Sequence, residues 1–394
     1  MGLTGFGRAA GGHEGARRRT RSRMKIHRIT TDPEKPRYLL VKLETDSGLA
    51  GWGEATLEGR SRTVAAAVGE LSERIGGEDP RRIEHLWQRM YRAGFYRGGP
   101  VFCSAISGIE QALWDILGKS LGVPVYQLLG GAARDRIRLY CQIPCETVEQ
   151  ALDAMRQRRA EGFTAFKLSP WRAINIVDHP AKIDRAVATV AALREAGGAE
   201  IEIALDAHGR MSPAMAIQFA RALEPYRPMF LEEPCLPENV DTMVRVARST
   251  SIPIATGERL FTKWGYREVL EKQAAAILQP DPSHCGGIFE ARKIAAMAEV
   301  YYAAVAPHCP LSAVALAACV QLAACTPNFL IQEHVTLGED LLVRPFAPKG
   351  GYVDLPTAPG LGIEVDERKL AALAYDGAWQ TPELRQDDGG VADW

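Results

Sequence analysis

The chain has 394 residues, of which 46% are hydrophobic and 24% charged, and its formal net charge at pH 7 is -1. This near-neutral balance argues against a basic nucleic-acid-binding surface, and no apolar stretch approaches the roughly 18 to 20 residues that span a bilayer. We therefore expect a soluble, cytoplasmic protein with neither nucleic acid nor membrane as a partner. The length favours two domains, one of them a barrel of about 250 residues.

The first part of the chain predicts an extension followed by an α+β domain. Residues 1–23 are rich in Gly and Arg without apolar periodicity, so we expect them to be disordered. From residue 25 to 54, runs of β-forming residues flank a TDSG turn, which predicts an antiparallel sheet. Apolar residues then recur at three- and four-residue spacing, which predicts helices over 62–75, 80–91 and 103–119. Residues 24–132 are assigned to this domain.

After Gly130 the pattern changes to short apolar strands that alternate with helices. Strict alternation indicates a parallel sheet with right-handed crossovers, and eight strands at this spacing predict a barrel over residues 133–346. The strand candidates are Arg138–Gln142, Ala165–Leu168, Glu202–Asp206, Phe230–Glu232, Ile254–Thr256, Ala276–Gln279, Ala303–Ala306 and Phe329–Gln332. Residues 347–394 leave this alternation, and the segment GYVDLPTAPGLGIEVDE within them resembles a hairpin and loop that could return to the first domain. Eight scattered cysteines without a CxxC pattern predict buried free thiols.

Acidic residues stand at or just past the ends of three consecutive strand candidates. They are Asp206, Glu232 and Glu258, which are separated by 26 residues in each step. Active sites of barrels are built at the C-terminal ends of the strands, so these carboxylates should converge. A single acid at a strand end is more often a helix cap or half of a salt bridge, but three that converge repel one another unless a cation binds. An all-oxygen shell favours Mg²⁺, or Mn²⁺, over zinc, and therefore predicts a divalent metal site.

The polar residues continue around the predicted barrel with Asp281, His308 and Glu333 after strands six, seven and eight. Asp281 and His308 would lie on neighbouring strands, where a carboxylate that accepts a hydrogen bond from one imidazole nitrogen makes the other more basic. This pair predicts a general base. His208 lies two residues past Asp206 and faces the same side, across the metal from His308. The two histidines could take a proton from one carbon and protonate a hydroxyl that leaves the next.

Lys167 ends the second strand candidate within the segment FKLSP. An ammonium at this place could help the metal to hold a substrate carboxylate, although a lysine at a strand end is more often a solvated surface residue. Other motifs are weak, because no glycine-rich stretch has phosphate-loop spacing and no Ser-His-Asp order fits a nucleophile elbow.

Five segments, ALDAHGRMS, FLEEP, ATGERL, LQPDPSHCGGI and APHCPL, resemble the mandelate racemase subgroup of the enolase superfamily. The likeness runs from Met24 to Trp394 and includes GWGEATLEGR and ALWDILGK in the first domain. It implies a (β/α)₇β TIM-like barrel beneath an α+β capping domain, which the N-terminal region and the C-terminal tail form together. A homo-oligomer is also implied.

The resemblance implies a role for each polar residue. The metal ligands would be Asp206, Glu232 and Glu258. His308, paired with Asp281, would be the base that abstracts the proton α to a carboxylate, and His208 the acid that protonates the departing 3-hydroxyl. Glu333 would hydrogen-bond the enediolate or the substrate carboxylate, and Lys167 would join the metal in binding the oxygens on which charge accumulates. The implied activity is that of an acid-sugar dehydratase, whose small-molecule sugar acid becomes a 2-keto-3-deoxy acid.

Departures from the family pattern leave alternatives open. The second lysine of the KxK arrangement is absent because position 169 is Ser169, which argues against a racemase that needs lysine on one face. A sugar-acid epimerase or a cycloisomerase could use the same enediolate, and a catalytically silent metal-binding homologue is a further alternative. The segments QIPCETVEQ, PWRAINIVDHP and HVTLGEDLL differ from the pattern near the barrel mouth, where they would shape the distal end of the pocket.

Overall fold

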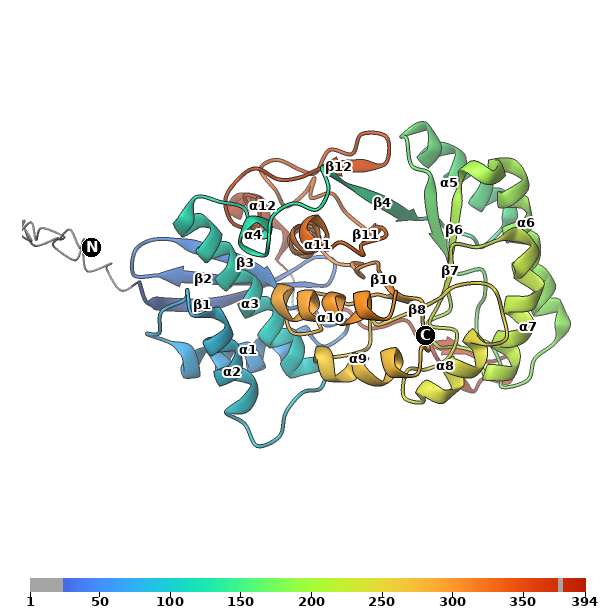
Figure 1. Cartoon of the computed structure of the whole chain (residues 1–394), viewed down its shortest axis with the longest axis horizontal. Coiled ribbons are helices and arrows are strands. Elements are labelled where there is room, and N and C mark those ends of the chain that lie inside the picture. Colours follow the sequence, from blue (N-terminus) through green and yellow to red (C-terminus); the bar gives the residue numbers. More distant parts are fainter. Residues whose placement is uncertain (1–23, 375–377) are drawn as a thin grey trace, which may run out of the picture.

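The computed structural model describes residues 24–374 and 378–394, so the predicted extension over residues 1–23 lies outside the described residues. In the described chain, a sheet-and-helix domain on the left of Figure 1 lies against a β/α barrel on the right. All eight cysteines are free thiols, and all but Cys145 are buried, as predicted. No helix among the described residues is long and apolar enough to cross a membrane.

The capping domain begins with the predicted antiparallel sheet, in the order β1 (Ile26–Glu34), β2 (Tyr38–Thr45) and β3 (Ala50–Glu54). Its helices are α1 (Ser61–Ile75), α2 (Ile83–Arg92), α3 (Pro100–Leu121) and the short α4 (Val125–Leu128). A Cβ atom at Gly53 would lie 2.1 Å from the carbonyl oxygen of Gly108. Glycine is therefore required in β3 so that α3 can pack directly on the sheet.

In the described chain, eight parallel strands form the barrel sheet in the order β10-β9-β8-β7-β6-β5-β4-β11. A parallel bridge between Val305 and Phe329 joins the two ends and closes the ring. The strands are β4 (Arg136–Gln142), β5 (Ala165–Leu168), β6 (Glu202–Asp206), β7 (Phe230–Glu232), β8 (Ile254–Thr256), β9 (Ile277–Leu278), β10 (Ala304–Val305) and β11 (Gln332–His334).

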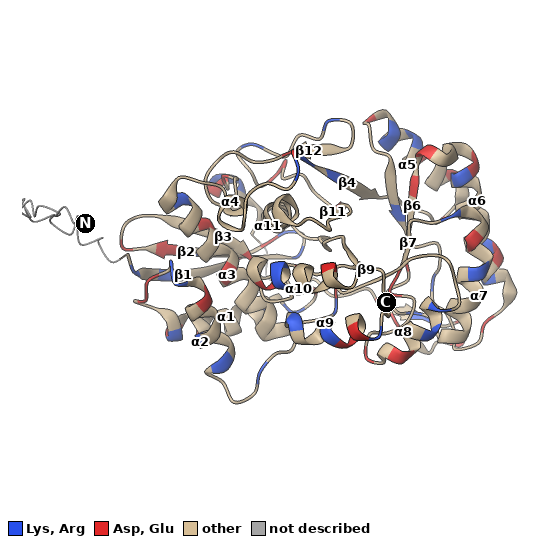
Figure 2. Cartoon of the chain, in the orientation of Figure 1, with Lys and Arg blue, Asp and Glu red and all other residues tan. Residues whose placement is uncertain are grey.

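Seven helices of the described chain connect these eight strands, which confirms the (β/α)₇β fold. They are α5 (Val148–Ala160), α6 (Pro180–Gly197), α7 (Pro213–Leu223), α8 (Val240–Ala247), α9 (Thr262–Glu271), α10 (Ile288–Val300) and α11 (Ala313–Cys325). Basic and acidic residues are interspersed along α5 and α6 (Figure 2), as expected for solvated helices that cover a barrel.

The last barrel strand differs from its prediction. We expected a strand over Phe329–Gln332, but β11 covers Gln332–His334. The apolar residues before it belong to the closing bridge with β10, since the amide of Leu330 donates to the carbonyl of Val305 at 2.8 Å. The following residues pair with β4 instead. Glu333 therefore lies inside a strand rather than after one.

A layer of side chains, one from each barrel strand or its immediate flank, fills the barrel interior. It consists of Tyr140, Ala165, Ala204, Phe230, Ala255, Ile277, Ala306 and Ile331. The rings of Tyr140 and Phe230 meet edge to face with centroids 6.3 Å apart, and small alanines accommodate this bulk. Because side chains alternate along a strand, the residue two positions beyond each layer member points toward the C-terminal mouth of the barrel.

The C-terminal segment contacts both domains. The predicted hairpin near residue 352 is wrong, because β12 (Tyr352–Asp354) instead pairs antiparallel with β4 of the barrel. Helix α12 (Glu367–Leu373) returns to the capping sheet, where the ammonium of Lys42 lies 2.6 Å from the carboxylate of Glu367. The final strands β13 (Leu384–Arg385) and β14 (Val391–Ala392) pair with each other.

Two buried carboxylates of the capping domain bind the N-termini of barrel helices. Glu110 on α3 accepts hydrogen bonds from the amides of Ile288 and Phe289 at 2.8 and 2.9 Å, at the start of α10. Glu54 on β3 accepts from the amide of Ala315 at 3.0 Å and from Ser312, at the start of α11. The first amides of a helix lack partners within it, so each carboxylate satisfies them and joins the two domains.

We expect Glu110→Ala to lower the unfolding free energy by about 2–4 kcal/mol, because the amides of Ile288 and Phe289 and the buried indole N–H of Trp114 lose their acceptor. The matched control is Glu84→Ala, which removes an exposed contact between α2 and Lys293 of α10 and should cost less than about 0.5 kcal/mol. Thermal unfolding of both variants measures the difference. Equal midpoints would show that the helix contact of Glu110 does not stabilise the domain interface.

Candidate active site

The side chains at the barrel mouth stand two positions further along each strand than the side chains of the interior layer, because alternate residues of a strand face the same side. Two positions beyond the eight members of that layer stand Gln142, Lys167, Asp206, Glu232, Gly257, Gln279, His308 and Glu333. Five of these were predicted as site residues. The structure brings them together with His208, Glu258 and Asp281, which lie in the loops after β6, β8 and β9.

The three predicted metal ligands converge. Asp206, Glu232 and Glu258 offer carboxylate oxygens that all lie within 4.8 Å of one another. Asp206 ends β6 and Glu232 ends β7, while Glu258 lies two residues beyond β8. Gly257 makes this turn with φ +146, and a Cβ there would lie 2.8 Å from the amide nitrogen of Gln279. A glycine is thus needed immediately before the third ligand.

The electrostatics of this cluster suit a divalent cation. Glu232 is fully buried, and its burial and then the charge of Asp206 raise the pKa of its carboxyl well above the usual range. Ionising all three carboxylates therefore requires positive charge among them. An oxygen-only donor set of this kind fits a hard cation, and the three carboxylates can hold a metal ion.

Lys167 lies at the centre of the carboxylates rather than on a solvated surface. Its ammonium is 2.9 Å from Asp206 Oδ2, 3.0 Å from both oxygens of Glu232 and 2.9 Å from Glu333 Oε1, and its side chain is 2% exposed. Burial alone would lower the pKa of Lys167, but the surrounding carboxylates hold it well above the usual value. The carboxylates therefore favour the charged form of the lysine beside the cation site.

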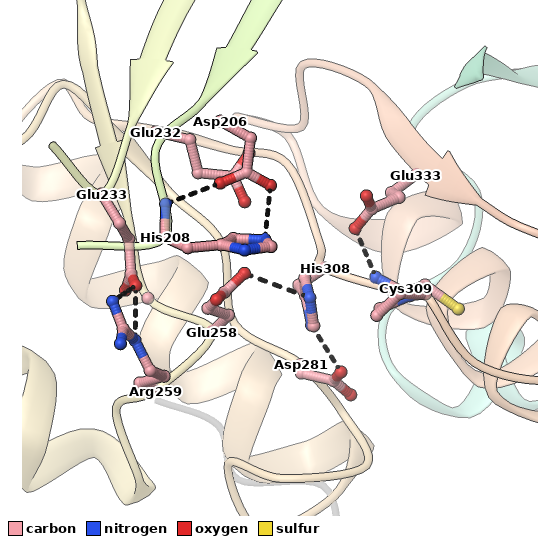
Figure 3. Close-up of polar contacts among 12 residues, drawn as sticks. Asp206, His208, Glu232, Glu233, Glu258, Arg259, Asp281, His308, Cys309 and Glu333 are labelled. Carbon is pink, nitrogen blue, oxygen red and sulfur yellow. Dashed lines mark hydrogen bonds and ion pairs between the residues drawn. The ribbon is translucent and has the colours of Figure 1, made fainter. Parts of the chain in front are cut away.

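His308 and Asp281 form the predicted pair (Figure 3). Nδ1 of His308 lies 2.8 Å from Oδ2 of Asp281, and Nε2 lies 3.1 Å from Oε2 of Glu258. Burial disfavours the charged ring, but Glu258 and the hydrogen bond to Asp281 raise the pKa of His308 well above 6.5. Nδ1–H therefore donates to Asp281, and the opposite nitrogen, Nε2, faces Glu258 of the cation site.

His208 contacts the same cluster of carboxylates, but at Asp206 rather than at Glu258. Its Nε2 lies 3.1 Å from Oδ2 of Asp206, as Figure 3 shows, and its backbone has φ 49 in the turn after β6. Nη2 of Arg210 lies 3.2 Å from the opposite ring nitrogen, Nδ1. Its side chain is 25% exposed, against 13% for His308. The structure thus places one imidazole beside Asp206 and the other beside Glu258.

Glu333 is surrounded by hydrogen-bond donors. Besides Lys167, it accepts from Nε2 of Gln142 at 3.1 Å and from the amide of Cys309 at 2.9 Å. Burial would raise its pKa, but Lys167 and then His308 lower it to about 2. In this state Glu333 is an ionised acceptor, so its position serves to hold Lys167 in place.

Several residues at the site were missed by sequence reasoning. Gln142 and Gln279 occupy inward positions of β4 and of the segment after β9, and the period of two could have identified both. Gln279 is fully buried, and neither of its amide atoms has a hydrogen-bond partner in the described chain. Arg210 could have been suspected only from its place two residues after His208.

A cavity of about 800 Å³ opens above these groups, within the usual size range of small-molecule sites. Its floor includes Lys167, Asp206, Glu258, His208 and His308. The capping domain and the C-terminal segment close it with Arg37, Leu57, Glu58, Thr381 and Trp394. The guanidinium of Arg37 pairs with Glu58 at 2.7 Å. The pocket is therefore completed by three parts of the chain that are distant in sequence.

Known proteins share this architecture. Residues 15–130 match the mandelate racemase / muconate lactonizing enzyme N-terminal domain, and residues 149–369 match the enolase C-terminal domain-like family. The chain is 50% identical to D-galactonate dehydratase of Ralstonia nicotianae and 48% identical to D-galactonate dehydratase of Cronobacter sakazakii. Each comparison extends over 382 residues, with 94% of this chain and 100% of the relative covered. An enolase from Agrobacterium radiobacter, solved with bound Na and L-malate, superposes with a TM-score of 0.89 at 35% identity, over 94% of this chain and 100% of that one.

Proposed function

We propose that this chain, a hydro-lyase of the mandelate racemase / muconate lactonizing enzyme family within the enolase superfamily, acts on D-galactonate. The reaction would remove water from this acid and give a 2-keto-3-deoxy acid. D-galactonate is chosen because relatives that match nearly the whole chain carry this activity in their names. The related enolase with bound L-malate supports a hydroxy acid as the type of ligand.

One observation carries the proposal. Two imidazoles contact different carboxylates of one cation site, His208 at Asp206 and His308 at Glu258. A carboxylic acid bound there by its carboxylate has a histidine on either side. Elimination of water needs a base at one carbon and an acid at the next, and this arrangement supplies both.

Abstraction of the α-proton is the difficult step, because the electron pair of the C–H bond moves into the carboxylate to form an enediolate. The neutral imidazole of His308 takes the proton at Nε2, while Asp281 accepts the hydrogen bond from Nδ1 and stabilises the imidazolium that results. A divalent cation, Mg²⁺ with Mn²⁺ as the alternative ion, would be held by Asp206, Glu232 and Glu258, and when bound it supplies electrophilic stabilisation of the carboxylate.

The charged residues of the chain stabilise the enediolate and complete the elimination. The ammonium of Lys167 donates hydrogen bonds to the carboxylate oxygens as charge accumulates there, and Glu333 keeps it oriented. The electron pair of the enediolate then forms the C2–C3 double bond. The 3-hydroxyl leaves with a proton from His208 as water, and the resulting enol tautomerises to the 2-keto-3-deoxy acid.

Purified protein incubated with D-galactonate and Mg²⁺ should produce a keto acid that reacts with semicarbazide, and EDTA should abolish the reaction. A panel of other aldonic and aldaric acids, measured in parallel, tests the choice of substrate. A keto product from a different acid alone would keep dehydration and replace D-galactonate. If C2–H exchanges with solvent deuterium and no acid yields a keto product, an epimerase or cycloisomerase would replace the dehydratase.

A further inference from the structure

The two site histidines are held by different means. His308 is anchored by Oδ2 of Asp281. The other oxygen of this carboxylate accepts a hydrogen bond from the amide of Ser283 at 2.6 Å, so the carboxylate is itself fixed. In the described chain, the nitrogen of His208 that points away from Asp206, Nδ1, faces Arg210 rather than a carboxylate. Its ring is held at its edges by Asp206 and Arg210, at 3.1 and 3.2 Å, and a quarter of the side chain remains exposed. The orientation of His208 therefore depends on what covers the face of its ring.

Trp394 covers that face. The two ring centroids are 5.2 Å apart with the planes tilted by 40°, and Trp394 also lines the cavity above the cation site. The C mark in Figure 1 lies close to β8, consistent with a tail that reaches the barrel mouth. The packing of an indole against the imidazole restricts the ring and excludes water from one side of it.

The segment that carries Trp394 is tied to the same part of the barrel. Strand β14 pairs with β13, and Nε2 of Gln386 between them donates to the carbonyl of Ile174 at 3.0 Å. Ile174 belongs to the loop after β5, and Nε1 of Trp171 in this loop donates to the carbonyl of Asp206 at 2.7 Å. A short chain of contacts thus relates the position of the tail to the strand end that bears Asp206 and His208.

We propose that Trp394 is a positioning residue for the proton transfer from His208, which rests on the proposed dehydration. The indole holds the imidazole in line with the leaving hydroxyl and keeps water from that side of the ring. Abstraction of the α-proton by His308 does not need this contact. Loss of Trp394 therefore affects the second chemical step selectively, and the enediolate returns to substrate more often than it loses water.

The test compares Trp394→Ala with Trp394→Phe in deuterated water, using D-galactonate and Mg²⁺. Keto acid is measured with semicarbazide, and deuterium at C2 of recovered substrate is measured by NMR. In the alanine variant we expect keto acid formation to fall about 10- to 100-fold, the cost of a misplaced catalytic group, while deuterium incorporation per keto acid formed rises. The phenylalanine variant keeps an aromatic face and should stay within about threefold of the wild type.

A second substrate separates positioning from general damage. Loss of fluoride from 3-deoxy-3-fluoro-D-galactonate needs no proton from His208. The Trp394→Ala variant should therefore release fluoride at the wild-type rate. If fluoride release and water loss fall together, Trp394 is only structural and the proposal is overturned. Unchanged keto acid formation in the alanine variant would overturn it as well. Failure of the proposed function would be recognised separately, because the wild type itself would then yield no keto acid.

Discussion

Replacement of His308 by asparagine should reduce keto acid formation by about 10³-fold, because it removes the imidazole proposed to take the α-proton. The same variant should lose deuterium exchange at C2, whereas His208→Asn should lose keto acid formation and retain exchange. This contrast follows from the two proposed roles, in which His308 acts before the enediolate forms and His208 acts after it. NMR of substrate recovered from deuterated water measures the exchange, and semicarbazide measures the product.

The matched control is His179→Asn, an exposed histidine at the start of α6 whose side chain makes no capping hydrogen bond. It should retain full activity. Binding of Mg²⁺, followed by calorimetry, should be preserved in His308→Asn because the three carboxylates proposed to hold the ion remain. Exchange at C2 that persists in this variant would exclude His308 as the base.

Replacement of Lys167 by methionine should produce the largest combined loss of stability and activity. Three buried carboxylates, Asp206, Glu232 and Glu333, lose the ammonium that lies within 3.0 Å of each. Breaking a buried charge cluster in this way costs about 3–5 kcal/mol of unfolding free energy. Methionine has a similar length and can pack over the ring of Tyr140, so the cost is mainly electrostatic.

Thermal unfolding in EDTA and in Mg²⁺ measures this effect. The midpoint of Lys167→Met should fall markedly in EDTA and recover in part with Mg²⁺, because the cation neutralises two of the three carboxylates. Activity should stay low in either case, since the proposed mechanism uses Lys167 as a hydrogen-bond donor to the substrate carboxylate. Lys349→Met is the control, because the pair of Lys349 with Asp354 is 3.4 Å long and Lys349 is 80% exposed. An unchanged midpoint for Lys167→Met in EDTA would show that this ammonium does not stabilise the cluster.

The barrel and its polar residues could be read from the sequence because they depend on local periodicity. The strand-and-helix alternation predicted the barrel, and the regular spacing of Asp206, Glu232 and Glu258 predicted that they converge. The same periodicity could also have located Gln142 and Gln279. It failed at β11, where Phe329 pairs with β10 and Gln332 with β4, so that one apolar run contributes to two different pairings. Assembly into a homo-oligomer stays a prediction.

Sequence by itself thus determined the fold class and the identities of the ionisable groups at the strand ends, because both repeat with the period of the local structure. Only the tertiary structure decided their surroundings. It buried Lys167 among three carboxylates, closed the pocket with Arg37 and Glu58 of the capping domain, and placed Trp394 against His208. These contacts join segments far apart in the chain, and no local pattern records which distant side chains will share a pocket once the two domains have packed together.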